Sequence, residues 1–333
     1  MTEKRRWKEM DMLRGMAILM VLLYHSILVF PVNLHEIMWC RMLHTFLWTV
    51  QMPLFFLVSG FCYSFRGSYR EYVVRKCRRI LIPHLVFSAL DILPRLIPNP
   101  FVHEQMDLQE AVTDLVLYGG SDWFLWTLFV IVLLFPALER LLTGSNALRR
   151  AGIFLVVLLF LAKPYITDLF LMNMVSQYLW YFFLGYGLRR KADHVFPKLK
   201  RPGFLLPALA SMLLFFAGFV VWNEEVWGGA RLLEVVCVLS SFLFFFALSG
   251  CCGRRLSGFL TDCGTWSLQM YLLDAYALVL TRTLLVSVLG LQIPAFIILG
   301  NFLADTVLVL LISKYILTKA KVFRIFCGIP EKG

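Results

Sequence analysis

Long runs of apolar residues recur along the whole chain, with short polar segments between them. A transmembrane helix needs about 20 consecutive, mostly apolar residues, and ten stretches approach that length. The segment HEQMDLQEAVTDLVLYGG (103–120) is too polar to cross a membrane and predicts a short amphipathic helix on its surface. The ten predicted spans lie at about 11–31, 44–65, 80–98, 123–142, 151–170, 173–189, 204–222, 230–250, 264–288 and 294–318. The pattern predicts an all-α polytopic membrane protein with about ten transmembrane helices.

The charged residues divide unevenly between the two sides of these spans. With a cytoplasmic N-terminus, most of the 32 lysines and arginines fall in cytoplasmic segments, whereas the outer loops carry acids. Because lysine and arginine mark cytoplasmic loops, we expect both termini in the cytoplasm. The same rule explains the net charge of +11, which therefore does not predict nucleic-acid binding. Since 60% of the residues are hydrophobic, we expect a single transmembrane domain over residues 1–333.

Several common kinds of site are not signalled by the sequence. The eight cysteines show no CxxC spacing, and the six histidines show no spacing typical of metal ligands. The chain also has no glycine-rich phosphate loop and no serine-hydrolase elbow. We therefore expect neither a bound metal nor a disulfide framework.

The first predicted span, DMLRGMAILMVLLYHS (11–26), contains both Arg14 and His25. Eleven residues at 100° each rotate by 1100°, about 20° more than three full turns, so both side chains share one helix face about 16 Å apart. An ionisable group inside a bilayer costs about 2.5–3.5 kcal/mol on insertion scales. Arg14 could snorkel to the inner interface, and His25 could bond a neighbouring helix. The shared face favours a common role for the two residues.

The second span, QMPLFFLVSGFCYSF (51–65), ends in small and polar residues. Gly60 next to Ser59 permits a close approach of another helix, which is a packing role. Ser59 and Tyr63 are also candidates for lining a polar cavity.

The segment RGSYREYVVRKCRRILIP (66–83) follows this span and predicts a basic cytoplasmic loop. Arg75 and Arg78 are three residues apart, with Lys76 and Arg79 beside them. Guanidinium groups suit bidentate binding of phosphate oxygens. From charge alone, the positive-inside rule and attraction to anionic lipids explain such a loop better than phosphate binding does.

The predicted fourth and ninth spans also contain candidates for substrate binding. Trp123 and Trp126 lie at the outer interface beside Asp122, where they form either an aromatic belt or a platform for a sugar. Asp274 lies in the middle of the ninth span and needs a partner or water. His25, Arg282 and residues of other spans are all open as its partner. Asp91 and Asp305 raise the same question.

Four segments, in order, resemble the integral-membrane acyltransferase family three, which includes sugar O-acetylases acting on cell-surface polysaccharides. They are DMLRGMAILMVLLYHS with its R-x10-H spacing, MPLFFLVSGF, RKCR leading to RRILIPHL, and WFLWTL. A fifth segment, CGTWSLQMYLLDAY, is similar to the family's late pattern G-x-x-S-x-x-x-Y-L-x-H. The resemblance extends over most of the chain.

The resemblance implies roles for individual residues. The family's essential arginine and histidine match Arg14 and His25. Its RxxR motif matches Arg75 and Arg78, which implies contact with the phosphates of acyl-CoA, and Arg79 extends this basic cluster. A span-four tryptophan of the family matches Trp123. Where many members have histidine after YLL, this chain has Asp274.

The function implied by the resemblance is that of a membrane O-acyltransferase. It would move an acyl group, with acetyl as the default, from cytoplasmic acyl-CoA to a hydroxyl of a carbohydrate across the membrane. The acceptor would be a polysaccharide or a lipid-linked sugar, and the location the bacterial cytoplasmic membrane. Arg14 would guide the donor, and His25 would act as general base or carry the acyl group as an acyl-imidazole. A homo-oligomer is left open.

Two other classes of protein fit parts of the same pattern. A multi-span transporter of a lipid-linked sugar or acyl group would also place ionisable residues in its spans. A membrane sensor with a degenerate acyltransferase site is a further alternative, to which Asp274 would contribute. Acyl transfer by the purified protein separates the enzyme from both.

Overall fold

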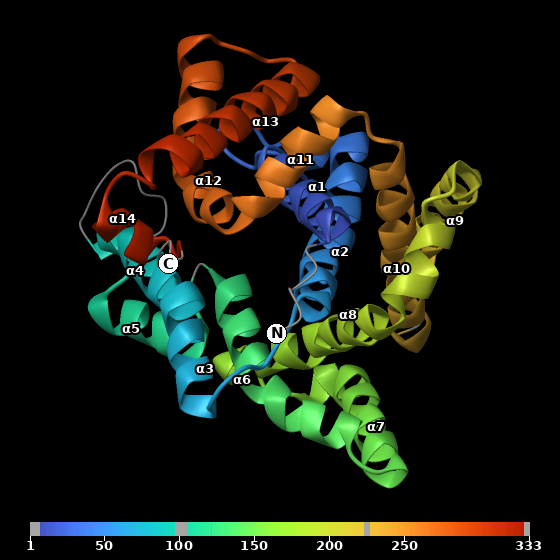
Figure 1. Ribbon diagram of the computed structural model, residues 1–333. Coiled ribbons are helices and arrows are strands. Elements are labelled where there is room, and N and C mark those ends of the chain that lie inside the picture. The colour runs from blue at the N-terminus through green and yellow to red at the C-terminus, as the bar shows by residue number, and fades with distance from the viewer. Residues whose placement is uncertain (1–6, 97–104, 121, 223–226, 330–333) are drawn as a thin grey trace. The chain divides into compact units, whose positions relative to one another are not determined.

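The computed structural model describes residues 7–96, 105–120, 122–222 and 227–329, and every element within them is helical (Figure 1). The α-helices are α1 (Lys8–His25), α2 (Met38–Phe61), α3 (Tyr69–Lys76), α4 (Ile82–Ile92), α5 (Leu108–Leu117), α6 (Trp123–Thr143), α7 (Asn146–Ala162), α8 (Met172–Leu199), α9 (Leu205–Trp222), α10 (Trp227–Cys251), α11 (Arg254–Thr265), α12 (Ser267–Arg282), α13 (Pro294–Leu311) and α14 (Lys321–Phe326).

Short 3₁₀ and π segments connect or extend these helices. The 3₁₀ segments are η1 (Leu34–Glu36), η3 (Leu93–Leu96), η4 (Lys163–Tyr165), η5 (Leu169–Leu171) and η6 (Pro202–Phe204). The π segments are η2 (Cys77–Leu81), η7 (Thr283–Val288) and η8 (Ile312–Ile316). The expected all-α fold is confirmed for the described residues.

Five of the described helical segments are long and apolar enough to cross a membrane, and Leu205–Val221 is a shorter apolar helix. The five are Met38–Phe61, Trp123–Thr143, Arg231–Cys251, Ser267–Val288 and Pro294–Ile316. The chain is therefore a membrane protein by composition and helix length. The count of ten spans and the cytoplasmic location of both termini remain predictions.

Several predicted boundaries were wrong. The first span was predicted to reach residue 31, but α1 ends at His25, where Ser26 turns its hydroxyl back to the carbonyl of Leu22. Residues 251–263 were left between the predicted eighth and ninth spans, yet Arg254–Thr265 form the amphipathic helix α11. Helix α8 also continues ten residues beyond the predicted end of its span at 189.

The polar segment after the third span does form a helix, as predicted. Helix α5 begins after Asp107, whose carboxylate accepts a bond from the backbone N–H of Glu110, and Glu110 bonds back to the Asp107 backbone. This reciprocal capping satisfies two backbone donors that would otherwise have no partner. Residues 103 and 104 of the predicted segment lie outside the described residues.

The residue contacts divide the chain into two compact units. Unit 1 comprises residues 1–58 and 187–316, and unit 2 comprises residues 59–186 and 317–333. The boundaries fall inside α2 and α8, which continue through both units.

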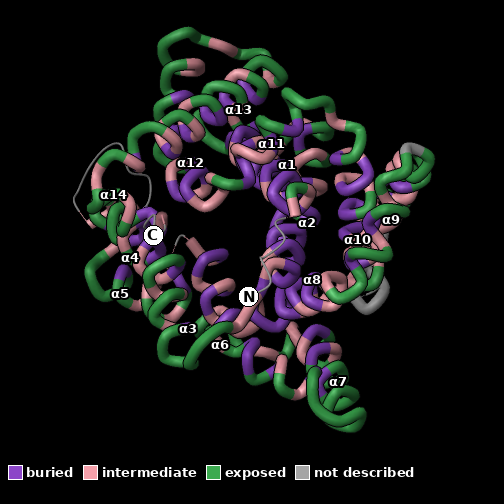
Figure 2. Tube along the Cα trace, viewed as in Figure 1, coloured by how far each residue is buried: buried purple, intermediate pink, exposed green. Residues whose placement is uncertain are grey.

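In unit 1, α1 packs against α10, α11, α12 and α13, while α9 lies along α10 and α12 along α13. Most of α1 is buried (Figure 2), and Leu13, Ala17 and Leu22 are fully so. Glycines allow α1 and α11 to touch backbone to backbone. A Cβ atom added at Gly15 would lie 2.0 Å from the Leu260 carbonyl oxygen, and one at Gly264 would lie 1.7 Å from that of Asp11.

In unit 2, α6 packs against α7 and against a helical run formed by α3, η2, α4 and η3. This run is unbroken from Tyr69 to Leu96 and begins with a capping box between Ser68 and Glu71. The basic segment predicted between the second and third spans is thus helical, and its cytoplasmic location and the span at 80–98 remain predictions. No glycine or proline interrupts residues 69–82, so the backbone stays helical through the basic residues. The late helix α14 lies against α4.

Candidate functional site

Helix α1 positions both residues of the R-x10-H pattern. The helix is unbroken from Lys8 to His25, so Arg14 and His25 share a face and lie about 16 Å apart along its axis, as predicted. Both side chains are only half-buried although most of the helix is covered. The face of α1 that carries Arg14 and His25 is thus distinct from the face that packs into the unit.

The side chain of His25 is paired with Asp274 of α12. The imidazole Nδ1 and the carboxylate Oδ2 form a short hydrogen bond. An ionised carboxylate only accepts, so Nδ1–H donates and the ring lone pair lies on Nε2. Asp274 is 1% exposed, whereas the His25 side chain is 38% exposed. The pair therefore has a buried carboxylate that orients a partly exposed histidine.

This pairing resolves which partner Asp274 has. His25, Arg282 and other spans were open from the sequence, and the structure selects His25. The guanidinium of Arg282 instead lies 6.0 Å from the ring centre of Phe30. Asp305 of α13 is fully buried and close enough to Asp274 for the two carboxyl groups to interact.

Aromatic side chains that the sequence did not single out surround His25. The Tyr24 ring lies 5.2 Å from that of His25 and stacks on His44 at 4.1 Å. His35 contacts His44 edge-on, and Trp48 lies 5.7 Å from Tyr24. Trp48 is 43% exposed. The four-residue spacing of His44 and Trp48 on one helix could have indicated that they share a face.

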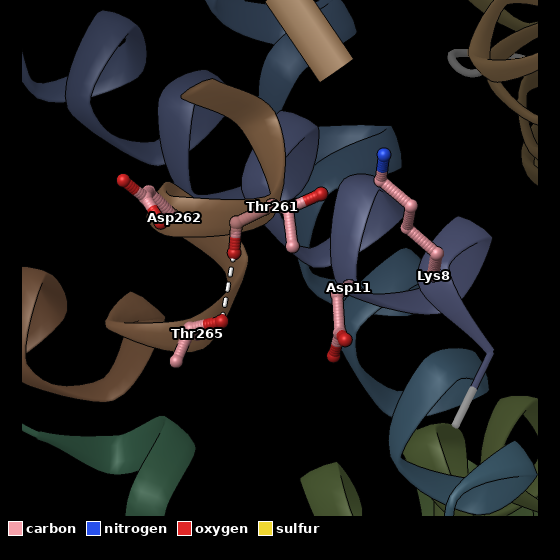
Figure 3. Close-up of a pocket in the computed structure, with 5 residues that line it drawn as sticks. All are labelled: Lys8, Asp11, Thr261, Asp262 and Thr265. Atoms are coloured by element: carbon pink, nitrogen blue, oxygen red, sulfur yellow. Dashed lines mark hydrogen bonds between the residues drawn. The ribbon is translucent and has the colours of Figure 1, made fainter. Parts of the chain in front are cut away.

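Arg14 is close to Asp11, one of the residues that line a cavity at the other end of α1 (Figure 3). Its guanidinium is 4.0 Å from the carboxylate of Asp11. Asp11 and Lys8 line one side of the cavity, whose volume is about 490 Å³, and Thr261, Asp262 and Thr265 of α11 line the other. Thr265 donates to the backbone oxygen of Thr261, as the dashed line in Figure 3 shows. The cavity therefore offers carboxylates, hydroxyls and an ammonium group to a polar ligand.

The arginines of the RxxR pattern belong to unit 2 and lie on its helical run. Arg75, Arg78 and Arg79 are all exposed. Arg75 donates to the backbone carbonyl of Arg66, and the ammonium of Lys76 lies 5.2 Å from the ring centre of Tyr72. The π segment η2 contains both Arg78 and Arg79.

The two tryptophans of α6 also lie in unit 2, each packed on a neighbour. Trp123 is 5.5 Å from the ring of Tyr178. Trp126 donates through Nε1 to the carbonyl of Phe170, and its ring is 5.7 Å from that of His84. Asp122 directly precedes α6. Burial, and secondarily the carboxylate of Asp91, raises the pKa of Asp122 to about 7.

The remaining predicted residues, Ser59 and Tyr63, lie near the end of α2. Ser59 is half-buried, and the neighbouring Gly60 touches α8, where an added Cβ would lie 1.9 Å from the Phe182 carbonyl oxygen. Tyr63 is buried, and its hydroxyl donates to Glu139 Oε2 at 3.1 Å. Tyr186 donates to the other oxygen of Glu139 at 2.9 Å. The sequence did not identify Glu139, whose partners come from distant segments.

Within the described residues, no group of three or more histidine, cysteine, aspartate or glutamate side chains is placed to hold a metal ion. The eight cysteines are free thiols.

The family model for acyltransferase family 3, described as an acyltransferase domain, matches residues 7–313. No curated protein and no solved structure matches the chain. The matched region includes the R-x10-H helix, the RxxR run, the α6 tryptophans and the His25–Asp274 pair.

Proposed function

The chain belongs to acyltransferase family 3, and from this premise we propose that it is a membrane O-acyltransferase with His25 as its general base. The donor is acyl-CoA, most simply acetyl-CoA, taken from the cytoplasm. The acceptor is a hydroxyl of a cell-surface or lipid-linked carbohydrate on the outer side of the membrane.

The His25–Asp274 pair is the observation that carries the proposal. With Nδ1–H bonded to a buried carboxylate, Nε2 has a lone pair available for the proton of an acceptor hydroxyl. An imidazole suits this task because its ordinary pKa of about 6.5 is close to working pH. The negative charge of Asp274 stabilises the imidazolium that forms.

The proposed reaction involves two proton transfers, one to His25 and one from it. The hydroxyl oxygen attacks the thioester carbonyl while Nε2 of His25 takes its proton, and the C–S bond of the donor breaks. The imidazolium returns the proton to the departing CoA thiolate, giving free CoA and an ester. In the alternative route, Nε2 itself attacks the thioester, and an acyl-imidazole passes the acyl group to the acceptor.

Basic residues are assigned to the donor. Arg14 guides and balances the charge of acyl-CoA, and the cavity beside Asp11 offers hydroxyls and carboxylates to its sugar and base. The guanidinium groups of Arg75, Arg78 and Arg79 bind its phosphates, since planar forks match phosphate oxygens. The pantetheine arm follows the shared face of α1 from Arg14 to His25, about 16 Å.

Aromatic residues are assigned to the acceptor. The exposed ring of Trp48, together with Tyr24 and His44 beside His25, offers flat faces on which a sugar ring stacks. Trp123 and Trp126, with Ser59 and Tyr63, remain candidates for further contacts with the carbohydrate.

The test is acetyl-CoA turnover by the purified protein in lipid nanodiscs, followed as release of the CoA thiol. The variant His25→Ala is expected to lose turnover while still binding CoA. The variant His194→Ala, which changes an exposed histidine of α8, is the matched control and is expected to keep it. Full turnover by His25→Ala would refute the proposed base. If the wild-type protein moves a lipid-linked sugar across vesicles without releasing CoA thiol, it is a transporter.

A further inference from the structure

A second buried carboxyl group lies beside the His25–Asp274 pair in unit 1. Asp305 is the central residue of the apolar segment Pro294–Ile316, and 0% of its surface is exposed. Helix α13, which carries Asp305, lies along α12 and also contacts α1 (Figure 1). His25, Asp274 and Asp305 therefore come from three helices that pack on one another. Ionisable residues in the middle of a span are costly and mark functional sites.

The carboxyl group of Asp305 faces that of Asp274, and the two side chains are within hydrogen-bond contact. Among the described residues, no N–H or O–H group donates to either carboxyl oxygen of Asp305. On Asp274, Oδ2 accepts from His25 Nδ1–H, whereas Oδ1 is buried and accepts from no such donor. Ionised carboxylates only accept hydrogen bonds, so a bond between the two groups requires a proton on one of them.

Within the described residues, Asp305 forms no ion pair that would neutralise it. The ammonium of Lys314, farther along the same helical run, pairs with Asp262. Arg282 of α12 lies over an aromatic ring. Asn301, one turn before Asp305 on the same face of α13, is fully buried, and its amide carries no charge. The immediate neighbours of Asp305 therefore offer no positive charge to an ionised carboxylate.

Two negative charges side by side in a buried site repel each other strongly, and such a carboxyl pair holds one proton between its members. The negative charge stays on the group whose other contacts stabilise the ionised form. Asp274 has such a contact, because His25 Nδ1–H donates to its Oδ2. Asp305 has no comparable donor among the described residues. The geometry thus favours an ionised Asp274 next to a neutral Asp305.

We propose that Asp305 is a positioning residue, which is protonated at working pH and whose O–H donates to Oδ1 of Asp274. This role deepens the proposed function and rests on it, because it concerns how the general base His25 is held. The neutral acid fixes the Asp274 carboxylate with Oδ2 directed at His25 and leaves its negative charge in place. Asp305 itself contacts neither donor nor acceptor and acts through the other two residues.

Two substitutions separate the donor role of Asp305 from a packing role. In Asp305→Leu a side chain of similar size has no O–H, and we expect kcat for CoA thiol release to fall about tenfold with the KM for acetyl-CoA unchanged. Tenfold corresponds to about 1.4 kcal/mol, close to the lower end of what a hydrogen bond to a charged group contributes. In Asp305→Asn the amide N–H replaces the acid O–H as donor, so we expect most of kcat to remain.

The variant Thr306→Val is the matched control. It removes a buried hydroxyl, without a partner among the described residues, from the next position of α13, which is rotated by about 100° from Asp305. We expect its kcat to be unchanged, and thermal unfolding checks that each variant is folded. Full kcat in folded Asp305→Leu would overturn the role. A loss in Asp305→Asn as large as in Asp305→Leu would show that the ionised form is required, and would overturn it as well.

Infrared spectroscopy detects the proton itself, because a protonated carboxyl group has a C=O stretching band that a carboxylate lacks. The spectra of the wild-type protein and of Asp305→Asn are compared one unit above the pKa of Asp122, which is about 7, so that most of Asp122 is ionised in both. We expect the band in the wild-type protein and its loss in the variant. A wild-type spectrum without the band would mean that Asp305 is ionised and would overturn the proposal.

The infrared band does not depend on turnover, so the two proposals can fail separately. A wild-type protein that shows the band but releases no CoA thiol would refute the proposed function and leave the shared proton in place. Normal turnover that is lost in His25→Ala, together with a missing band, would keep the proposed base and refute the role of Asp305.

Discussion

The substitution Asp274→Asn changes the partner of the proposed base, His25, with little disturbance of the surrounding side chains. Asparagine has nearly the same shape, and its amide oxygen can still accept the bond from His25 Nδ1–H. What is lost is the negative charge next to the imidazolium. Asp274 is 1% exposed, so water does not replace that charge.

The expected size of the effect follows from the kind of bond. A hydrogen bond to a charged partner contributes about 1.5–3 kcal/mol, and each 1.36 kcal/mol of transition-state stabilisation is a factor of ten in rate. We therefore expect kcat to fall about 10- to 150-fold. The KM for acyl-CoA is expected to stay unchanged, because Asp274 is assigned no contact with the donor.

The assay is the initial rate of CoA thiol release at several acetyl-CoA concentrations, with thermal unfolding of the detergent-solubilised protein as a check of folding. The variant Asp168→Asn makes the same chemical change at an exposed position in the 163–171 connection and is expected to leave kcat unchanged. An unaltered kcat in a folded Asp274→Asn protein would show that the buried carboxylate does not support His25 in catalysis.

Three further predictions concern stability and pH. In Gly264→Ala the new Cβ would lie 1.7 Å from a backbone oxygen of α1, so the two helices must separate. We expect a loss of about 1–3 kcal/mol, measured by thermal unfolding, whereas Gly258→Ala in the same helix meets nothing within 4 Å and serves as control. The raised pKa of Asp122 means that the folded protein binds this proton more tightly than the unfolded chain does. Its contribution to stability is therefore present below its ordinary pKa of 3.8 and is lost as pH rises through about 7. Asp122→Asn is expected to remove this part of the pH dependence of thermal unfolding. Tyr63→Phe removes the 3.1 Å bond to Glu139 and is expected to cost about 1–3 kcal/mol of stability. Because Tyr63 is a candidate for contact with the carbohydrate, the KM for the acceptor is also expected to rise; an unchanged KM would limit Tyr63 to a structural role.

Much of the helical framework could be predicted because it depends on local sequence. The apolar runs of α6, α10 and α13 are long enough to be recognised without any tertiary information. The spacing of Arg14 and His25 follows from helix geometry once the segment is assigned as a helix. The capping residues of α5 could likewise be recognised from local sequence.

The partner of Asp274 could not be predicted for a physical reason. His25 and Asp274 are 249 residues apart in sequence, and the bond between them depends on how α12 packs against α1. The contacts of Glu139 could not be predicted for the same reason, because its two tyrosine partners come from α8 and from the turn after α2.

The basic segment was assigned as a cytoplasmic connection from its charge, which predicts the side of the membrane and not whether the connection is helical. Arginine and lysine are good helix formers, and residues 69–82 contain no glycine or proline. The chain therefore continues its helix through the arginines, and charge alone gives no indication of their depth. Helix α11 was overlooked for a related reason, since an amphipathic helix that packs on α1 needs no long apolar run.

The backbone contact between Gly15 and α11 has a consequence for the size of the substrate. With no side chain between the two backbones, α1 is held directly against α11 next to Arg14. Repacking of side chains therefore cannot shift one helix along the other. The distance along the helix from the Arg14 guanidinium to the His25 imidazole is therefore constant. If acyl-CoA is the donor, as we propose, an arm that matches that length places the carbonyl at His25 whatever acyl group it carries. Under this proposal, differences in acyl chain length would be accommodated beyond the imidazole, among the aromatic rings around it.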